Sequence, residues 1–179
     1  GTVQERHAGD RPHTDFDPAN CTGGHCERRV AYLTVVTQML VDDLQEMVEA
    51  WKADGGARAE VQADPQQGLI AMLTGLGSLS YGELAGERMK LGLMLHDPEE
   101  EHDCFSDNTH NSHYYNQVGM MNVYQGQYKR LDGSVLKGAS LSELIAQKDS
   151  TLDAEVRARM KEAHDALLAI KNRAETTET

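Results

Sequence analysis

The amino-acid sequence predicts an all-α protein, an up-and-down bundle of four to five helices. Apolar residues recur every three or four positions in several long segments. Aromatic residues make up only 5% of the chain, and all four prolines fall in loops or at helix starts. A core made of Leu, Met, Val and Ala suits helices better than sheets. No strand-like alternation or hairpin turn is evident between the helical segments.

The first 27 residues predict an irregular segment. They contain two prolines and several glycines among polar residues, a composition typical of loops. Cys21 and Cys26 stand five positions apart across a Gly-Gly pair. A small disulfide loop is the simplest interpretation, and it implies an oxidising compartment. The alternative is a metal site using Cys21, His25 and Cys26, which needs a fourth ligand from elsewhere in the chain.

Residues 28–173 predict the helical bundle, and residues 174–179 predict a frayed tail. Each helix is indicated by one apolar face with polar residues opposite. These faces comprise Leu33, Val36, Leu40, Leu44, Met47 and Trp51 in the first helix, Leu69, Met72, Leu73 and Leu76 in the second, Tyr114, Tyr115, Val118, Met121 and Tyr124 in the third, and Val156, Met160, Leu167 and Ile170 in the last.

Three helix starts carry capping signals. Asp64 precedes Pro65, which occupies the first helical position. Ser140 is followed three residues later by Glu143, as in a capping box. Ser106 or Asp107 is expected to cap the third helix, which continues to about Tyr128. Leu131-Asp132-Gly133-Ser134 predicts a turn.

Small and acidic residues alternate in the middle of the second helix. Gly82 and Gly86 lie four apart, which predicts close approach of a neighbouring helix. Glu83 and Glu87 share one face of an α-helix, and Arg88 follows. A buried carboxylate pair facing another helix is how carboxylate metal sites in bundles are built. The alternative is an exposed face with ordinary ion pairs.

Residues 99–113 hold the densest group of candidate metal ligands. Carboxylates and imidazoles within one or two helical turns can bind a metal. The alternative is that these polar groups cap a helix and line solvated turns. The group comprises Glu101, His102, Asp103, Ser106, Asp107, Asn108, His110 and His113.

Charge and missing motifs exclude several function classes. The formal net charge of −12 disfavours nucleic acid and anionic membranes as partners. No apolar run approaches the roughly 20 residues that span a membrane. The sequence has no metalloprotease His-Glu-x-x-His pattern, no phosphate loop and no Gly-x-Ser-x-Gly elbow.

Two segments resemble the imelysin family. One is Thr74–Met89, and the other is Glu100–His110 with its continuation Asn122–Tyr128. Together with the helix opening at Arg28, the resemblance covers roughly residues 11–130. It implies a two-bundle helical protein of which this chain is one half, exported to the periplasm or the outer surface of a bacterial cell. The family's Gly-x-His-x-x-Glu motif belongs to the first half and does not occur here.

The resemblance also implies a functional site between the two bundles. On this side it would be lined by Glu83, Glu87, Arg88, Glu101, His102, Ser106, Asp107, Asn108 and His110. Among these, Glu87, Asp107 and His110 are the predicted metal ligands, for iron or zinc.

Three functions are therefore carried forward. The first is an envelope protein that binds a metal ion, in iron uptake. The second is a metallopeptidase whose remaining residues come from the missing half. The third is a non-catalytic structural or interaction module. The expected partners are a metal ion and the N-terminal half of the same protein or a companion chain, and the chain itself is expected to be trimmed.

Overall fold

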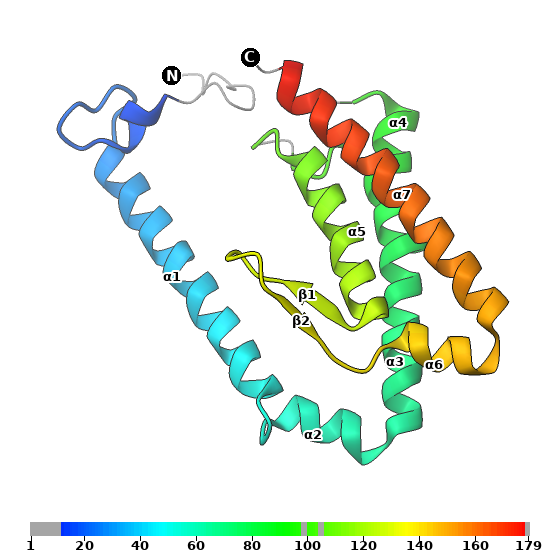
Figure 1. The fold of residues 1–179 in the computed structure, drawn as a ribbon. Coiled ribbons are helices and arrows are strands. Elements are labelled where there is room, and N and C mark those ends of the chain that lie inside the picture. The colour runs from blue at the N-terminus through cyan, green and yellow to red at the C-terminus, as the bar shows by residue number, and fades with distance from the viewer. Residues whose placement is uncertain (1–11, 98–99, 104–105, 178–179) are drawn as a thin grey trace. The chain divides into compact units, whose positions relative to one another are not determined.

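The computed structural model confirms an all-helical chain with a single short hairpin among the residues that it describes, which are 12–97, 100–103 and 106–177 (Figure 1). The chain divides into two compact units, residues 1–75 and 76–179. One up-and-down bundle for the whole chain stays a prediction. None of the described helices is long and apolar enough to cross a membrane.

The first unit is built around one long helix. This helix, α1, contacts η1 and α2, and α3 continues the chain toward the second unit. The predicted cap of α3 is confirmed, since the Gln67 amide donates to the Asp64 carboxylate at 3.1 Å. The elements are η1 (His13–Phe16), α1 (Cys26–Trp51), α2 (Gly56–Ala63) and α3 (Pro65–Gly77).

A tightly bonded loop joins η1 to α1. The predicted disulfide between Cys21 and Cys26 is confirmed, with the sulfurs 2.02 Å apart, so neither sulfur is free to bind a metal. The Asp15 side chain is fully buried beneath this loop. Its carboxylate accepts a hydrogen bond of 2.9 Å from the Thr22 hydroxyl. The Arg29 Nε donates to the Asp15 carbonyl, also at 2.9 Å, which ties the loop to α1.

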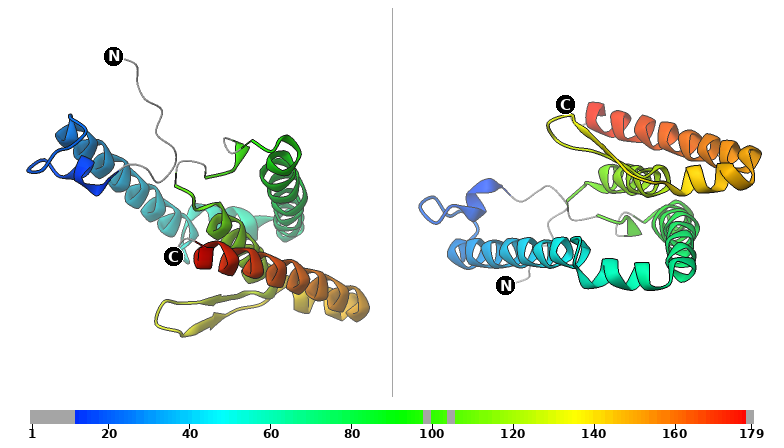
Figure 2. Two further views of the ribbon diagram at one scale, coloured as in Figure 1. Left: turned by 90° about the horizontal axis from the view of Figure 1, so that it is seen from above. Right: turned by 60° about the horizontal axis from the view of Figure 1, so that its bottom comes forward.

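The second unit packs helices around α5 (Figure 2). Helix α5 contacts the π-helix η2 and α7, and α6 contacts both α5 and α7. Leu84, Met120 and Leu167 form the core where η2, α5 and α7 meet. The elements are η2 (Ser78–Lys90), α4 (Leu91–Leu95), α5 (Thr109–Gln125), β1 (Gln127–Lys129), β2 (Val135–Lys137), α6 (Leu141–Lys148) and α7 (Ser150–Thr177).

A buried carboxylate ties three of these helices together. The Asp153 carboxylate on α7 accepts hydrogen bonds from the Ser142 hydroxyl at 2.6 Å, the Arg157 Nε at 2.9 Å and the Tyr124 hydroxyl at 3.0 Å. The bond from Ser142 lowers the pKa of Asp153 most, and Tyr124 and Arg157 act in the same direction against burial. Asp153 therefore stays ionised and joins α5, α6 and α7.

The hairpin between α5 and α6 was not predicted. Strands β1 and β2 pair antiparallel with Tyr128 opposite Leu136, and the predicted turn 131–134 lies between them. Strands of three residues are too short to show the alternation that marks a strand. Gly126, with a φ of 59°, ends α5 before the predicted limit at Tyr128, because the left-handed conformation stops the helix.

Two helix ends can be compared with their predictions. Ser140 and Glu143 form the predicted capping box of α6. The predicted cap of α5 by Ser106 or Asp107 is wrong, because α5 begins at Thr109 with no side-chain cap. Local hydrogen bonding among polar residues fixes this start instead, as described for the site below.

Candidate functional site

The π-helix η2 forms one side of the candidate site. The close helix approach predicted at Gly82 and Gly86 is not found among the described residues. A Cβ atom at Gly82 would meet nothing within 4 Å, and at Gly86 it would meet only the Tyr81 carbonyl of the same helix. Side chains of an α-helix meet at spacings of three and four, whereas a π-helix bonds residue i to i+5.

The π-helical register determines which charged side chains meet. Arg88 Nη2 lies 2.9 Å from Glu83 Oε2, an ion pair between residues five apart, and both side chains are partly buried. Glu87 is exposed. The structure therefore pairs Glu83 with Arg88, the partner that a partly buried carboxylate needs. Segments with i→i+5 bonding are frequent at functional sites, which draws attention to the groups nearby.

His113 lies on the buried face of α5. It shares that face with Gln117, Met120 and Tyr124, at successive spacings of four, three and four, and all four side chains are buried. Gln117 Nε2 donates to the Met160 carbonyl of α7 at 2.9 Å, so its polar group is satisfied. His113, at 7% exposure, is thus an imidazole placed where the helix pattern otherwise puts core residues.

The Nε2 atom of His113 is buried and has no hydrogen-bond partner among the described residues. Its ring stacks on that of His102, with the ring centroids 6.3 Å apart and the planes 23° from parallel. His102 itself is exposed, so the pair reaches from the interior to the surface. A buried polar atom without a partner costs free energy, and a bound water or ion is one way in which native proteins satisfy it.

The surroundings of His113 keep its imidazole neutral. Burial lowers its pKa most, because an apolar environment disfavours the charged ring. The nearby His102 and the Arg88 guanidinium lower the pKa further, and Asp103 opposes them. A neutral imidazole carries a lone pair on one ring nitrogen, which is the form that binds metals.

Asp103 anchors the loop that carries His102. The Ser112 hydroxyl of α5 donates to the Asp103 carboxylate. The Asp103 amide donates to the Thr109 hydroxyl oxygen at 2.9 Å, and the Ser106 amide donates to the Asp103 carbonyl at 3.0 Å. These bonds fasten the loop to the start of α5, the end from which His113 projects.

The other predicted residues lie around this loop. Asp107 is exposed and has a φ of 52°, and Ser106 and Asn108 are also exposed. Glu101 is half-buried, as is His110. The His110 Nε2 lies 3.1 Å from the Asn111 side-chain nitrogen. The hydrogen bond from Lys171 lowers the pKa of Glu175 on α7 most, and His110 acts in the same direction.

The predicted ligands can be compared with these positions. Within residues 12–97, 100–103 and 106–177, no three His, Cys, Asp or Glu side chains are grouped closely enough to hold a metal ion. The assignment of Glu87, Asp107 and His110 as ligands stays a prediction. Cys104 lies outside the described residues.

The comparison with protein families decides the identity of the fold. The imelysin profile matches residues 4–178, almost the whole chain. This chain belongs to the imelysin family. The segments that carry His102, Arg88 and Glu83 are among those whose sequence resembles imelysins. The sequence matches none of the curated proteins with which it was compared.

Sequence reasoning placed His113 and Asp103 among the candidate metal ligands of residues 99–113 but not in the lining of the site, and it missed Ser112. His113 was a candidate ligand of that group, but it was not among the three ligands chosen, Glu87, Asp107 and His110. The signal that could have singled it out is its spacing from Gln117, Met120 and Tyr124, which places a histidine on the core face of α5.

Proposed function

We propose that this imelysin chain supplies part of a metal-binding site, through which the whole protein captures iron in the bacterial envelope. The observation that carries the proposal is the buried Nε2 of His113, which no described residue satisfies. A metal ion bound to that nitrogen would remove the cost of leaving it unpaired.

The donors at this site suit a metal that accepts imidazole. His113 and the stacked His102 are the residues that would hold it, and imidazole suits Fe²⁺ and Zn²⁺. Glu83 neutralises the nearby Arg88, which reduces the repulsion that a free guanidinium would exert on a cation. Two imidazoles are fewer ligands than such metals take, so the proposal requires further ligands from outside this group.

The rest of the protein is the proposed source of those ligands. The resemblance to imelysins implies a second helical half, and α1 offers a surface for contact with it. Met39, Leu44, Met47 and Trp51 on α1 are each more than half exposed, although helices with this much apolar surface are normally covered. The confirmed disulfide supports location in an oxidising compartment such as the periplasm.

The metallopeptidase alternative has less support. It requires a metal with an open coordination position and a general base beside it. No observation among the described residues favours peptide cleavage over metal capture. Metal-loaded protein incubated with a panel of unstructured peptides is expected to leave them intact. Peptide cleavage that depends on His113 would favour the metallopeptidase function over metal capture.

Metal titration of the whole chain tests the proposal. Isothermal titration calorimetry with Fe²⁺ under anaerobic conditions, and with Zn²⁺, is expected to show binding. His113→Gln is expected to weaken the metal affinity at least tenfold, because loss of an outer-shell partner already lowers metal affinity about 10- to 100-fold and loss of a ligand lowers it more. His96→Asn is the matched control. His96 is an exposed histidine of the same unit in a left-handed conformation that Asn tolerates. Equal affinity for His113→Gln and the wild type would reject the proposal.

A second variant separates metal binding from a structural role. His113→Leu replaces the unsatisfied imidazole with an apolar side chain, so the metal-free protein is expected to keep or gain about 1 kcal/mol of stability. The rise in Tm that added metal produces in the wild type is expected to disappear. A large loss of stability with the metal-dependent rise intact would assign His113 to the fold alone.

The pH dependence follows from the lowered pKa of His113. Protons compete with metal for the imidazole, and an ordinary histidine becomes protonated below about pH 6.5. Because the His113 pKa is lower than this, the ring stays unprotonated at more acidic pH. As the pH is lowered, the metal affinity is therefore expected to stay constant past about pH 6.5 and to fall only at more acidic pH.

A further inference from the structure

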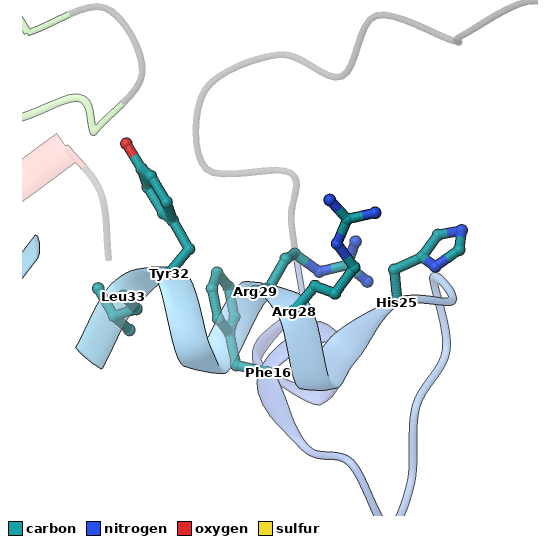
Figure 3. Close-up of a pocket in the computed structure, with 6 residues that line it drawn as sticks. All are labelled: Phe16, His25, Arg28, Arg29, Tyr32 and Leu33. Carbon is teal, nitrogen blue, oxygen red and sulfur yellow. The ribbon is translucent and has the colours of Figure 1, made fainter. Parts of the chain in front are cut away.

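A second candidate site lies in the first unit, beside the disulfide loop. A pocket of about 570 Å³ opens where η1 meets the first turns of α1 (Figure 3). This volume is within the range of small-molecule sites in proteins. The pocket is lined by Phe16, His25, Arg28, Arg29, Tyr32 and Leu33.

The lining is basic, which is unusual in a chain of net charge −12. Two guanidinium groups and an imidazole line the pocket, and none of its described lining residues carries a carboxylate. Arg29 is already engaged, since it donates to the carbonyl groups of Asp15 and Gly24 and lies 3.9 Å from the Asp15 carboxylate. Arg28 is exposed and makes no hydrogen bond or ion pair with the described residues. Its charge is therefore available to an anion.

The remaining lining is apolar and aromatic. Phe16 is 38% exposed and Tyr32 is 72% exposed, and Leu33 lies one residue further along α1. Figure 3 shows the Tyr32 and Arg28 side chains projecting on the same side of α1, with the Phe16 ring from η1 drawn between them against the helix. Aromatic surface of this kind favours a flat apolar group, whose ring can stack or meet it edge-on.

The position of the pocket is fixed by the loop beneath it. The disulfide closes the chain between Cys21 and Cys26, and the buried Asp15 holds Arg29 and Thr22. Phe16 on η1 is thereby kept next to α1. A pocket whose walls are held in place before binding loses less entropy when a ligand enters.

We propose that this pocket binds a small aromatic carboxylate, with the carboxylate on Arg28 and the aromatic ring between Phe16 and Tyr32. The guanidinium of arginine can donate two parallel hydrogen bonds to one carboxylate. A ligand with both a carboxylate and an aromatic ring would use Arg28 and the aromatic wall together. The pocket shares no residue with the proposed metal site: its lining belongs to the first unit, whereas His113 belongs to the second. Failure of either proposal leaves the other unaffected.

The test uses the whole chain with 2-naphthoate as the probe. Calorimetry or ligand-observed NMR is expected to detect binding of 2-naphthoate and to show an affinity for the neutral 2-naphthamide that is at least tenfold lower. Arg28→Gln is expected to weaken 2-naphthoate about tenfold, the size of one lost charged hydrogen-bond pair. Arg58→Gln removes an exposed arginine of α2 in the same unit and is expected to leave binding unchanged.

A second variant tests the aromatic wall. Tyr32→Ala removes an exposed side chain, so the circular dichroism spectrum is expected to stay unchanged. Binding of 2-naphthoate is expected to weaken, and binding of acetate, which has no ring, is expected to be undetectable. Binding of acetate as tight as that of 2-naphthoate would overturn the aromatic part of the proposal. Absence of 2-naphthoate binding, or equal binding by wild type and Arg28→Gln, would overturn the whole.

Discussion

The two units of this imelysin chain are stabilised in different ways. The second unit has a core in which Leu84, Met120 and Leu167 are at most 6% exposed, and a buried carboxylate that joins three helices. The first unit concentrates its buried groups in the loop at the head of α1, where Asp15 and Cys26 are covered. Along α1 itself, most of the large apolar side chains are at least half exposed.

This difference shows that an apolar helical pattern does not by itself produce a core. Both α1 and α5 carry apolar faces. Helix α5 packs against η2 and α7, whereas the contacts of α1 with described elements of its own unit are those with η1 and α2. Burial, and not helix formation, supplies most of the stability of a helix in a protein. The first unit therefore depends on local covalent and hydrogen-bonded ties, and the second on packing.

Two methionines offer the sharpest test of this contrast. Met120 is 3% exposed and Met39 is 57% exposed. Met120→Ala is expected to cost about 3 kcal/mol, because it leaves a cavity in the core. Met39→Ala is expected to change stability by less than about 0.5 kcal/mol. Urea unfolding of both variants measures the difference. Equal losses would mean that α1 is covered in solution, and the contrast would fail.

Removal of the disulfide is expected to have the next largest effect, confined to the first unit. Replacing both Cys21 and Cys26 by Ser is expected to cost about 2 kcal/mol, the chain entropy of so short a closed loop. Amide hydrogen exchange would show faster exchange over residues 12–29, while α5 and α7 keep their protection. Faster exchange throughout α5 would contradict the independence of the two units.

The hydroxyl of Tyr124 tests the polar tie in the second unit. Tyr124→Phe is expected to cost about 1 kcal/mol, since one hydrogen bond to Asp153 is lost while the bonds from Ser142 and Arg157 remain. Burial, with the bond to Asp153, raises the pKa of Tyr124 to about 12.

The sign of the pH dependence follows from that shift. The folded pKa lies above the value of about 10 in the unfolded chain, so the stabilisation is complete below pH 10 and declines as the pH approaches 12. The stability difference between wild type and Tyr124→Phe is therefore expected to narrow over this window. A difference that grows above pH 10 would show that the phenol is not buried in its neutral form.

The sequence predicted the features that depend on local chemistry. Asp64 and Ser140 cap their helices because their side chains reach amides within three residues, and Cys21 pairs with Cys26 across a short loop. The features that were missed depend on packing or on an unusual backbone. Arg88 was a candidate partner for Glu83 or Glu87. Nothing in the spacing of residues 78–90 distinguishes a π-helix from an α-helix, so the choice of Glu83, five residues away, could not be foreseen.

The candidate site was predicted only in part, because some of its features follow from local sequence and others from packing. The polar stretch before α5 was recognisable from its composition, and His102 was assigned to it. The spacing of His113 from Gln117, Met120 and Tyr124 places it on the core face of α5, but its burial depends on the packing of η2 and α7 on α5, which is a tertiary feature. Composition therefore locates the candidate site along the chain, whereas tertiary packing selects the imidazole whose nitrogen is left without a partner.

Two glycine substitutions, one in each unit, are expected to give the smallest changes in stability. Gly82 lies in η2 with nothing within 4 Å of an added Cβ, so Gly82→Ala is expected to raise stability by about 0.5–1 kcal/mol, the cost of glycine in a helix. Gly68 of α3 is the matched control. There a Cβ would lie 2.8 Å from Val61 Cγ1 and 3.0 Å from the Val61 carbonyl oxygen, so Gly68→Ala is expected to destabilise the first unit. Thermal unfolding of both variants gives the two signs. If Gly82→Ala lowers Tm instead, the glycine does mark a close helix contact in the whole protein, as its spacing from Gly86 predicts, and the partner surface would then extend to η2.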